Sequence, residues 1–302
     1  MSGTRDYIHL HFIVFLWGFT AVLGKLISSP PVELVLQRTF FSALGLVLII
    51  AMARRTFRIH GGRNLLLVLI AGLMIAAHWI LFFLAARLAN VSVCLSAMAT
   101  TAIWTSLLEP ISLGKRIKPY ELLLGVVAFL GILVIFQGDF EYGFGFLIAV
   151  LAAVLSAVFS VINVHVIRTN DPYTISLYEL GFAALSIAGF LPFYVNLTDE
   201  GQLHLIPQGM DWVYLLVLVT VCTIYAFTAS VELMRRLSAF TINLIINLEP
   251  VYGIILALLV FGAAEQMSGT FYLGTVIILL SVLIYPPLKK YFESRKPQVD
   301  PS

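Results

Sequence analysis

The sequence predicts an all-α polytopic membrane protein, with ten transmembrane helices arranged as two inverted five-helix repeats. Composition, recurring apolar runs and an internal similarity between the two halves support this prediction. The chain has 302 residues, of which 60% are hydrophobic and only 11% are charged, and its mean hydropathy is +0.99. Soluble domains usually carry about 25% charged residues. We therefore expect nearly the whole chain to lie in a membrane.

Ten apolar runs follow one another along the chain. Each is long enough to cross about 30 Å of hydrocarbon as a helix that rises about 1.5 Å per residue. The strands of a membrane barrel would instead be alternating segments of about ten residues. Short turns such as SSPP, QGDFEYG, TNDP and GAAEQMSG separate the runs. In order, the predicted spans are residues 8–28, 33–53, 65–88, 91–113, 119–137, 143–166, 173–196, 211–236, 239–262 and 268–287.

The positions of the basic residues predict an orientation for these spans. In a ten-span topology, all Lys and Arg residues except Lys25, Arg38 and Arg87 lie on the same side of the membrane. Cytoplasmic loops carry the excess of basic residues. The sequence therefore predicts a multi-pass protein of the plasma (inner) membrane with both termini in the cytoplasm.

Two alignments relate the first half to the second. A shift of 141 residues places Pro31 on Pro172 and LQRTFFSALGL on LYELGFAALSI. A shift of 149 residues places Arg87 on Arg236 and ELLLGVVAFLGILVIF on TFYLGTVIILLSVLIY. The triplet LEP occurs twice, but 140 residues apart, so Glu249-Pro250 aligns with Thr100-Thr101 rather than with the first LEP. We predict repeats at 1–138 and 139–287, followed by a cytoplasmic tail at 288–302.

Five spans in each half give the two halves opposite orientations in the membrane. Inverted repeats of this kind are typical of transporters, in which the substrate site lies near the midplane between the halves. Because inverted repeats also occur in channels, the pattern indicates transport more firmly than it indicates a carrier.

Four segments together resemble the EamA-type ten-helix permeases of the drug/metabolite transporter superfamily. They are FLWGFTAVLGK in span one, LQRTFFSALGL after Pro31 in span two, SLLEPISLGKRIKPYELLLGVVAFLGILVIF, and INLEPVYGIILALLVFGAAEQMSGTFYLG. The resemblance implies a central cavity lined by spans one to four and six to nine, and movement of small organic metabolites, often outward. The sequence departs from the family at one position. The family usually carries an acid soon after the glycine that ends spans four and nine. Here Lys115 comes directly after Gly114, whereas Glu265 comes three residues after Gly262.

Glu249 is the leading candidate for a functional group in the membrane. It lies about ten residues into span nine, or about 15 Å deep, where an ionisable group is costly and needs a reason. Pro250 frees a backbone carbonyl and kinks the helix, and Asn243 and Asn247 lie on a neighbouring face. We expect Glu249 to bind the substrate or a coupling proton; a structural glutamate bonded to neighbouring helices is the alternative.

Arg38 and Glu179 occupy equivalent positions under the 141-residue shift. Inversion places Arg38 near the outer face and Glu179 at a similar depth from the inner face, so the two could guard the mouths of a cavity. The alternative is that each is a structural ion held by local partners. Further candidates for substrate binding are Thr100, Trp79, His78 and Tyr178. A lone histidine such as His78 is more often a hydrogen-bonded structural residue, and Tyr178 is a weaker candidate.

We expect structural roles for two other carboxylates, Glu232 and Glu109. Glu232 lies three and four residues before Arg235 and Arg236, a spacing that permits ion pairs on a helix surface. Glu109 has Lys115 and Arg116 nearby. Lys25 can extend to the outer interface, or meet an anionic substrate.

The sequence therefore predicts a secondary transporter that exports small organic metabolites, either amino-acid-like compounds or drugs, by alternating access. A proton-coupled uptake permease and a passive solute channel remain alternatives. We expect no enzyme activity, because the six His residues are scattered in depth and side. The expected partners are a small-molecule substrate and the lipid bilayer. Protons and a second copy in a homodimer stay open as further partners, and no cofactor, metal or nucleic acid is expected.

Overall fold

The computed structural model describes residues 4–114, 119–136, 140–197 and 203–294, which form helices and short connections without any strand. The helices of the first half are α1 (Thr4–Leu26), α2 (Pro31–Met52), α3 (Gly62–Leu88), α4 (Val91–Met98), α5 (Thr101–Ser112) and α6 (Pro119–Phe136). Those of the second half are α7 (Gly143–Val166), α8 (Pro172–Tyr194), α9 (Asp211–Val219), α10 (Ala226–Leu233), α11 (Ala239–Ile246), α12 (Glu249–Phe261), α13 (Gly269–Leu283) and α14 (Tyr285–Ser294). A π-helical segment, η3 (Thr220–Tyr225), joins α9 to α10.

The helices confirm the predicted all-α, multi-pass class. In the described ranges, eight helical segments are long and apolar enough to cross a membrane, and a shorter apolar helix covers Gly269–Ser281. Several of these segments consist of two helices in series, such as α4 with α5 and α11 with α12. Helix α6 and the shorter helix α13 lie at the positions of predicted spans five and ten. The count of ten membrane crossings stays a prediction.

The two alignments of the halves are visible in the helix ends. Proline occupies the first position of both α2 and α8, at Pro31 and Pro172. A proline is favoured there because its missing N–H would have no helical partner. The 141-residue shift therefore describes the structure as well as the sequence.

The fourth and ninth predicted spans break at equivalent places. Helix α4 ends at Met98 and α5 starts at Thr101, whereas α11 ends at Ile246 and α12 starts at Glu249. The break beside Pro250 is the predicted kink. The other break has no proline; instead the Thr100 and Thr101 hydroxyls donate to the Ala97 and Met98 carbonyls at 2.8 and 2.7 Å. Such side-chain bonds compete with the helix and bend it.

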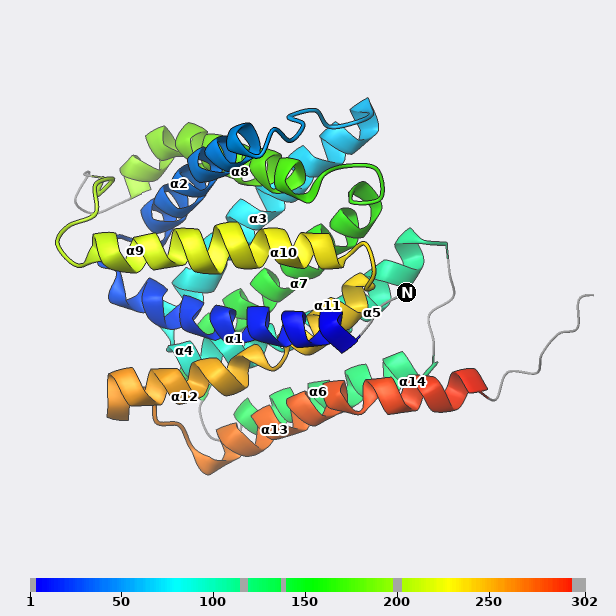
Figure 1. The fold of residues 1–302 in the computed structure, drawn as a ribbon. Coiled ribbons are helices and arrows are strands. Elements are labelled where there is room, and N and C mark those ends of the chain that lie inside the picture. The colour runs from blue at the N-terminus through cyan, green and yellow to red at the C-terminus, as the bar shows by residue number, and fades with distance from the viewer. Residues whose placement is uncertain (1–3, 115–118, 137–139, 198–202, 295–302) are drawn as a thin grey trace, which may run out of the picture.

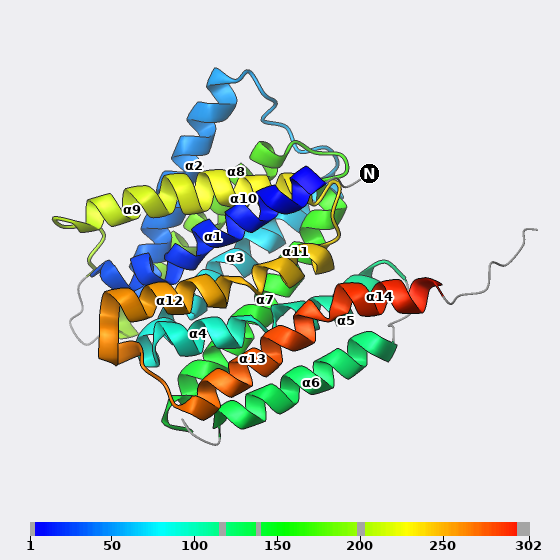
Figure 2. The ribbon, with the colours of Figure 1, turned by 60° about the horizontal axis from the view of Figure 1, so that its bottom comes forward.

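The two halves interdigitate around a shared interior. Helix α3 packs on α7 and α8, α1 packs on α12, and α4 packs on both α7 and α12. Figure 1 shows α2 and α8 along one edge of the bundle, with α6 and α13 along the opposite edge. Figure 2 shows α6 and α13 side by side there, away from α2 and α8. Helices α6 and α13 are therefore peripheral.

The α6–α13 contact depends on two glycines that face each other. A Cβ atom at Gly131 would lie 2.8 Å from the Gly274 carbonyl oxygen, and one at Gly274 would lie 2.5 Å from the Gly131 carbonyl oxygen. Small residues of this kind let two membrane helices approach closely.

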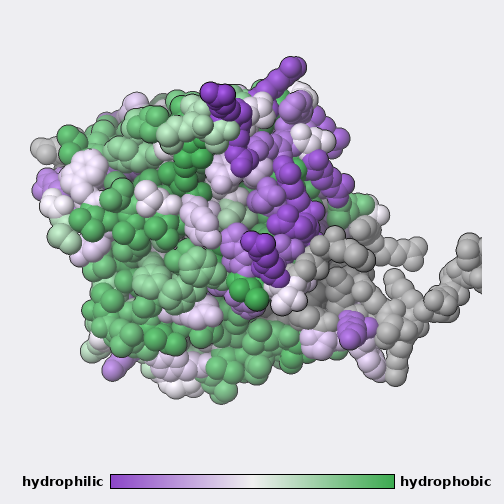
Figure 3. Space-filling view, in the orientation of Figure 1, coloured by the Kyte–Doolittle hydropathy of each residue, from purple (hydrophilic) through white to green (hydrophobic). Residues whose placement is uncertain are grey.

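Hydrophilic side chains gather at one end of the bundle. Figure 3 shows them mainly on the side where α1 begins, whereas hydrophobic side chains cover most of the rest of the visible face. We call this the basic end; its exposed arginines are Arg5, Arg54, Arg55, Arg58, Arg63, Arg168, Arg235 and Arg236. Arg55 pairs with Asp171 at 2.8 Å, and Arg236 pairs with Asp6 at 3.0 Å. The other end, where α1 stops, is the far end.

Some sequence predictions fall outside the described residues. These are the boundary between the repeats at 138 and 139, the basic residues Lys115, Arg116 and Lys118, and the last part of the tail, residues 295–302. The first part of the tail lies within α14, which begins before residue 288.

Candidate functional site

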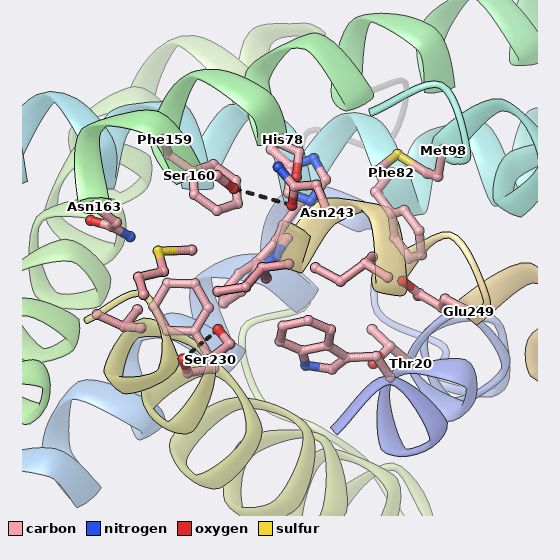
Figure 4. A pocket seen from close by; sticks show the side chains of 18 of the residues that line it. Thr20, His78, Phe82, Met98, Phe159, Ser160, Asn163, Ser230, Asn243 and Glu249 are labelled. Atoms are coloured by element: carbon pink, nitrogen blue, oxygen red, sulfur yellow. Dashed lines mark hydrogen bonds between the residues drawn. The ribbon is translucent and has the colours of Figure 1, made fainter. Parts of the chain in front are cut away.

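A cavity of about 720 Å³, counting space open to solvent, lies between the two halves. The cavity is lined by side chains from seven of the predicted spans. They lie on or next to the helices α1, α2, α3, α4, α7, α10, α11 and α12, the last two of which form one span. Spans five, seven and ten contribute none among the described residues. Figure 4 shows the lining residues, with Asn163 and Glu249 toward opposite sides of the view. They are Trp17, Thr20, Arg38, His78, Trp79, Phe82, Met98, Ser156, Phe159, Ser160, Asn163, Phe227, Ser230, Val231, Met234, Ile242, Asn243, Ile246 and Glu249.

Glu249 reaches the cavity from the helix break. It is the first residue of α12 and is half-buried. The amino-terminal end of a helix carries a partial positive charge that stabilises a carboxylate. Within the part of the chain that the structure describes, Glu249 has no ion pair and no side-chain hydrogen bond. Its carboxylate is therefore available to a ligand in the cavity.

Arg38 brings a positive charge into the same cavity from α2. Its side chain is only 2% exposed. Nε donates to the Thr223 hydroxyl at 2.8 Å, and the guanidinium carbon lies 3.7 Å from the centre of the Trp79 ring. Its Nη1 atom is buried without a hydrogen-bond partner, and no carboxylate of the described residues lies within 4.0 Å of it. Arg38 is thus held by a hydroxyl and an aromatic ring but lacks an anion.

The π-helical segment η3 explains how Thr223 meets Arg38. The Thr223 hydroxyl donates to the carbonyl of Leu218, five residues earlier, at 2.7 Å, and accepts from Arg38. Single π turns in α-helices are often found at functional sites.

Aromatic rings form much of the wall, and hydrogen bonds hold two of them. The ring of His78 is bonded through Nδ1 to the Ala152 carbonyl at 2.8 Å and lies 5.5 Å from the Phe159 ring centre. Trp17 donates to the Cys222 carbonyl at 2.9 Å, and Phe227 packs edge-on against Trp79. These contacts give the cavity a rigid apolar side.

A polar patch from α5, α7 and α11 faces the apolar side. The Asn243 amide donates to the Thr105 hydroxyl at 2.8 Å, and the Ser160 hydroxyl donates to its amide oxygen at 3.5 Å. Asn163 lies one turn beyond Ser160, and its amide lies beside the Glu179 carboxyl group without a well-formed hydrogen bond. The patch can therefore bond further to a ligand.

Five of the nine predicted binding residues line this cavity, namely Glu249, Asn243, Arg38, Trp79 and His78. The other four lie apart from it. Thr100 turns its hydroxyl to its own backbone, and Asn247 is buried at the helix break. Tyr178 packs against the core, and Glu179 is fully buried on α8.

Sequence reasoning missed the polar residues of α7. Ser156, Ser160 and Asn163 are spaced four and three residues apart, so they share one face of an otherwise apolar helix. That spacing was the signal that could have found them.

Three other carboxylates have structural roles. Glu232 lies 3.6 Å from Arg235 and 3.7 Å from Arg236, as its spacing predicts. Glu265 pairs with Lys25 at 2.7 Å and accepts from the backbone N–H groups of Val91 and Ser92, so it caps α4. Glu109 accepts from the Phe240 N–H at 2.8 Å and caps α11.

The two caps are related in function but not in sequence position. Each carboxylate comes from one repeat and holds the amino-terminal end of a broken helix in the other. Lys25 is therefore engaged with Glu265 and is not a free cation for an anionic substrate in this structure.

Two interleaved helical halves around a central cavity are the architecture of membrane transporters built from internal repeats. The sequence profile of the EamA-like transporter family matches residues 7–137 and 143–285. The chain therefore belongs to the EamA-like transporter family, within the drug/metabolite transporter superfamily.

One solved structure, titled only "Crystal structure of protein", is similar to 97% of this chain over 100% of its own length. Its TM-score is 0.71 at 18% sequence identity, so this similarity shows the fold alone. No curated protein matches the chain.

Proposed function

We propose that this transporter exports small zwitterionic metabolites, such as amino-acid-like compounds or drugs of similar charge, across the plasma (inner) membrane. The observation that carries the proposal is the presence in one cavity of a carboxylate, Glu249, and a guanidinium, Arg38, neither of which forms an ion pair within 4.0 Å among the described residues. A substrate with a cationic and an anionic group would supply both missing partners.

The lining of the cavity fits such a substrate. Ligand cavities are mostly apolar, with a few polar groups that fix orientation. Here the aromatic wall of Trp79, Phe159 and Phe227 would take an apolar side chain. Arg38 would bind the anionic group through charge-assisted hydrogen bonds, and Glu249 would bind the cationic group.

Contacts at the two ends support loading from the cytoplasm. The cavity lining extends to Asn163 and Met234, near the basic end, where α7 and α10 finish. At the far end, several polar contacts draw helices together. Arg87 donates to the Ile27 and Ser29 carbonyls at 2.9 and 2.5 Å, and Ser28 bonds to Asp211. With the basic end in the cytoplasm, the cavity would fill from inside and empty outward after the halves exchange conformation.

Untargeted metabolite profiling of cells and medium tests this proposal. A host that expresses the wild type is compared with hosts that express Glu249→Gln or the control Glu232→Gln. Glu232 is also a membrane-helix carboxylate, but it is paired with exposed arginines. We expect a few zwitterionic compounds to be enriched outside with the wild type and with Glu232→Gln, and not with Glu249→Gln. The same compounds enriched inside would reverse the direction, and wild-type enrichment with Glu249→Gln would remove Glu249 from the mechanism.

A further inference from the structure

Glu179 is a second membrane carboxylate whose environment differs from that of Glu249. Its side chain is 0% exposed, and among the described residues neither carboxyl oxygen has an ion-pair partner or a well-formed hydrogen bond, the neutral Asn163 amide lying beside it. Burying a charge without a partner is very costly, so a carboxyl group in this position avoids being charged. This burial therefore favours the neutral, protonated form of the group in this conformation.

Among the described residues, no charged side chain lies close enough to the Glu179 carboxylate to neutralise it in place of a proton. Helices α2, α3 and α10 pack on α8, and α7 brings Asn163 to the Glu179 carboxyl. None of the ionisable residues on these described helices forms an ion pair with Glu179 within 4.0 Å. They are Glu33, Arg38, Arg63, His78, Arg87, His165 and Glu232.

The backbone of α3 closes one side of the Glu179 position. Gly72 has no side chain there, and a Cβ atom on it would lie 2.5 Å from the Glu179 carbonyl oxygen. Ser176, one turn before Glu179, is likewise buried with its hydroxyl unpartnered. These polar groups are sealed from solvent. Asn163, which lies beside the Glu179 carboxyl group, also lines the cavity.

The repeat shows how Glu179 would become accessible. Arg38 and Glu179 each lie seven residues after the first proline of their helix, α2 or α8. Arg38 lines the cavity in this conformation and Glu179 does not. In inverted-repeat transporters the two halves exchange roles between conformations. The exchanged conformation would place Glu179 at the cavity wall, where water can reach its carboxyl group.

We propose that Glu179 is the binding site of a coupling proton, separate from the substrate site at Glu249 and Arg38. In the exchanged conformation, the Glu179 carboxylate exchanges a proton with water in the cavity. In the present conformation, the O–H bond is intact and the neutral group is buried. One O–H bond forms or breaks in each cycle, and water supplies or accepts the proton.

The first experiment tests whether Glu179 carries a proton, and it needs no substrate. Infrared difference spectra between acidic and alkaline buffers are recorded on the reconstituted wild type, Glu179→Gln and Glu232→Gln. We expect a carboxylic-acid C=O band in the wild type and in Glu232→Gln that is missing in Glu179→Gln. Identical spectra of the wild type and Glu179→Gln would overturn the proposal.

The coupling is tested in proteoliposomes with radiolabelled phenylalanine as the probe, and this test rests on the proposed function. A pH gradient should drive accumulation by the wild type and by Glu232→Gln. With Glu179→Gln, accumulation should fall to the level without a gradient while exchange across equal pH continues. Gradient-driven accumulation by Glu179→Gln would overturn the proposal, as would equal losses of exchange and accumulation. If the wild type moves no phenylalanine, the proposed substrate class fails for this probe, and the infrared result still decides the role of Glu179.

Discussion

At the residue scale, the proposed function depends on two charged groups that form no ion pair with any described residue. Arg38 is oriented by Thr223 and Trp79, and Glu249 is presented by the helix break. Holding a charged group in place without neutralising it prepares a site for a ligand of opposite charge. The arrangement explains why both residues lie in an otherwise apolar membrane interior.

Replacing Arg38 should weaken substrate binding. Arg38→Gln removes the charge-assisted hydrogen bonds to the anionic group, each about 1.5–3 kcal/mol, and we therefore expect about a tenfold or larger rise in KM. The measurement is transport of the compounds identified by metabolite profiling. Arg58→Gln, at an exposed position of the basic end, is the matched control and should keep the wild-type KM. An unchanged KM with Arg38→Gln would show that Arg38 is structural.

Replacing Glu265 should lower stability. Its carboxylate pairs with Lys25 and accepts from two backbone N–H groups, so Glu265→Gln loses several charge-assisted bonds worth about 1.5–3 kcal/mol each. We expect a clear fall in the thermal midpoint of the purified protein in detergent. Glu232→Gln breaks only exposed ion pairs, worth about 0–1 kcal/mol, and should leave the midpoint nearly unchanged. Equal midpoints for the two variants would contradict the capping role.

At the element scale, the paired helix breaks and the α6–α13 contact organise the bundle. The break before Glu249 could be predicted from Pro250, because proline removes a helical hydrogen bond. The equivalent break at Thr100 could not, because threonine hydroxyls bend a helix only in some tertiary settings. The caps were equally hidden, since Glu109 and Glu265 meet helices that are distant in the sequence.

A methyl group at the α6–α13 contact should destabilise the protein. Gly274→Ala places a Cβ atom 2.5 Å from the Gly131 carbonyl oxygen, and overpacking of this kind typically costs about 1–3 kcal/mol. Gly181→Ala is the matched control, because no heavy atom lies within 4 Å of its added Cβ. Thermal unfolding in detergent should show a lower midpoint for Gly274→Ala and an equal or higher midpoint for Gly181→Ala. A fall with Gly181→Ala alone would contradict the packing described here.

At the scale of the whole molecule, composition and the internal repeat were enough to predict the class, and the resemblance of four segments to EamA-type permeases predicted the family. The 141-residue shift could be read from Pro31 and Pro172, since proline has the same position in both helices. The cavity could be predicted only in part. Glu249 and Arg38 stood out because charges are rare in apolar spans, whereas Ser156 and Ser160 were concealed among residues common in membrane helices. Which side chains reach the cavity depends on helix rotation, which one sequence does not specify.

The orientation in the membrane is a prediction of the whole charge distribution. We expect the basic end to lie in the cytoplasm, because eight exposed arginines gather there. Single cysteines at Arg58 and at Leu205, which lies near the far end, can be labelled from outside intact cells with an impermeant thiol reagent. Labelling at position 205 and not at position 58 is expected. Labelling at position 58 alone would invert the topology and the direction of loading.

The most direct test of the charged cavity is flux of one identified zwitterionic substrate in proteoliposomes. The comparison includes the wild type, Arg38→Gln, Glu249→Gln and the double variant, each verified to be folded by its thermal midpoint. Our account predicts that each single variant loses most of the flux and that the double variant is little worse than either one, because both charges bind the same substrate. Wild-type flux in the folded Glu249→Gln variant would contradict it.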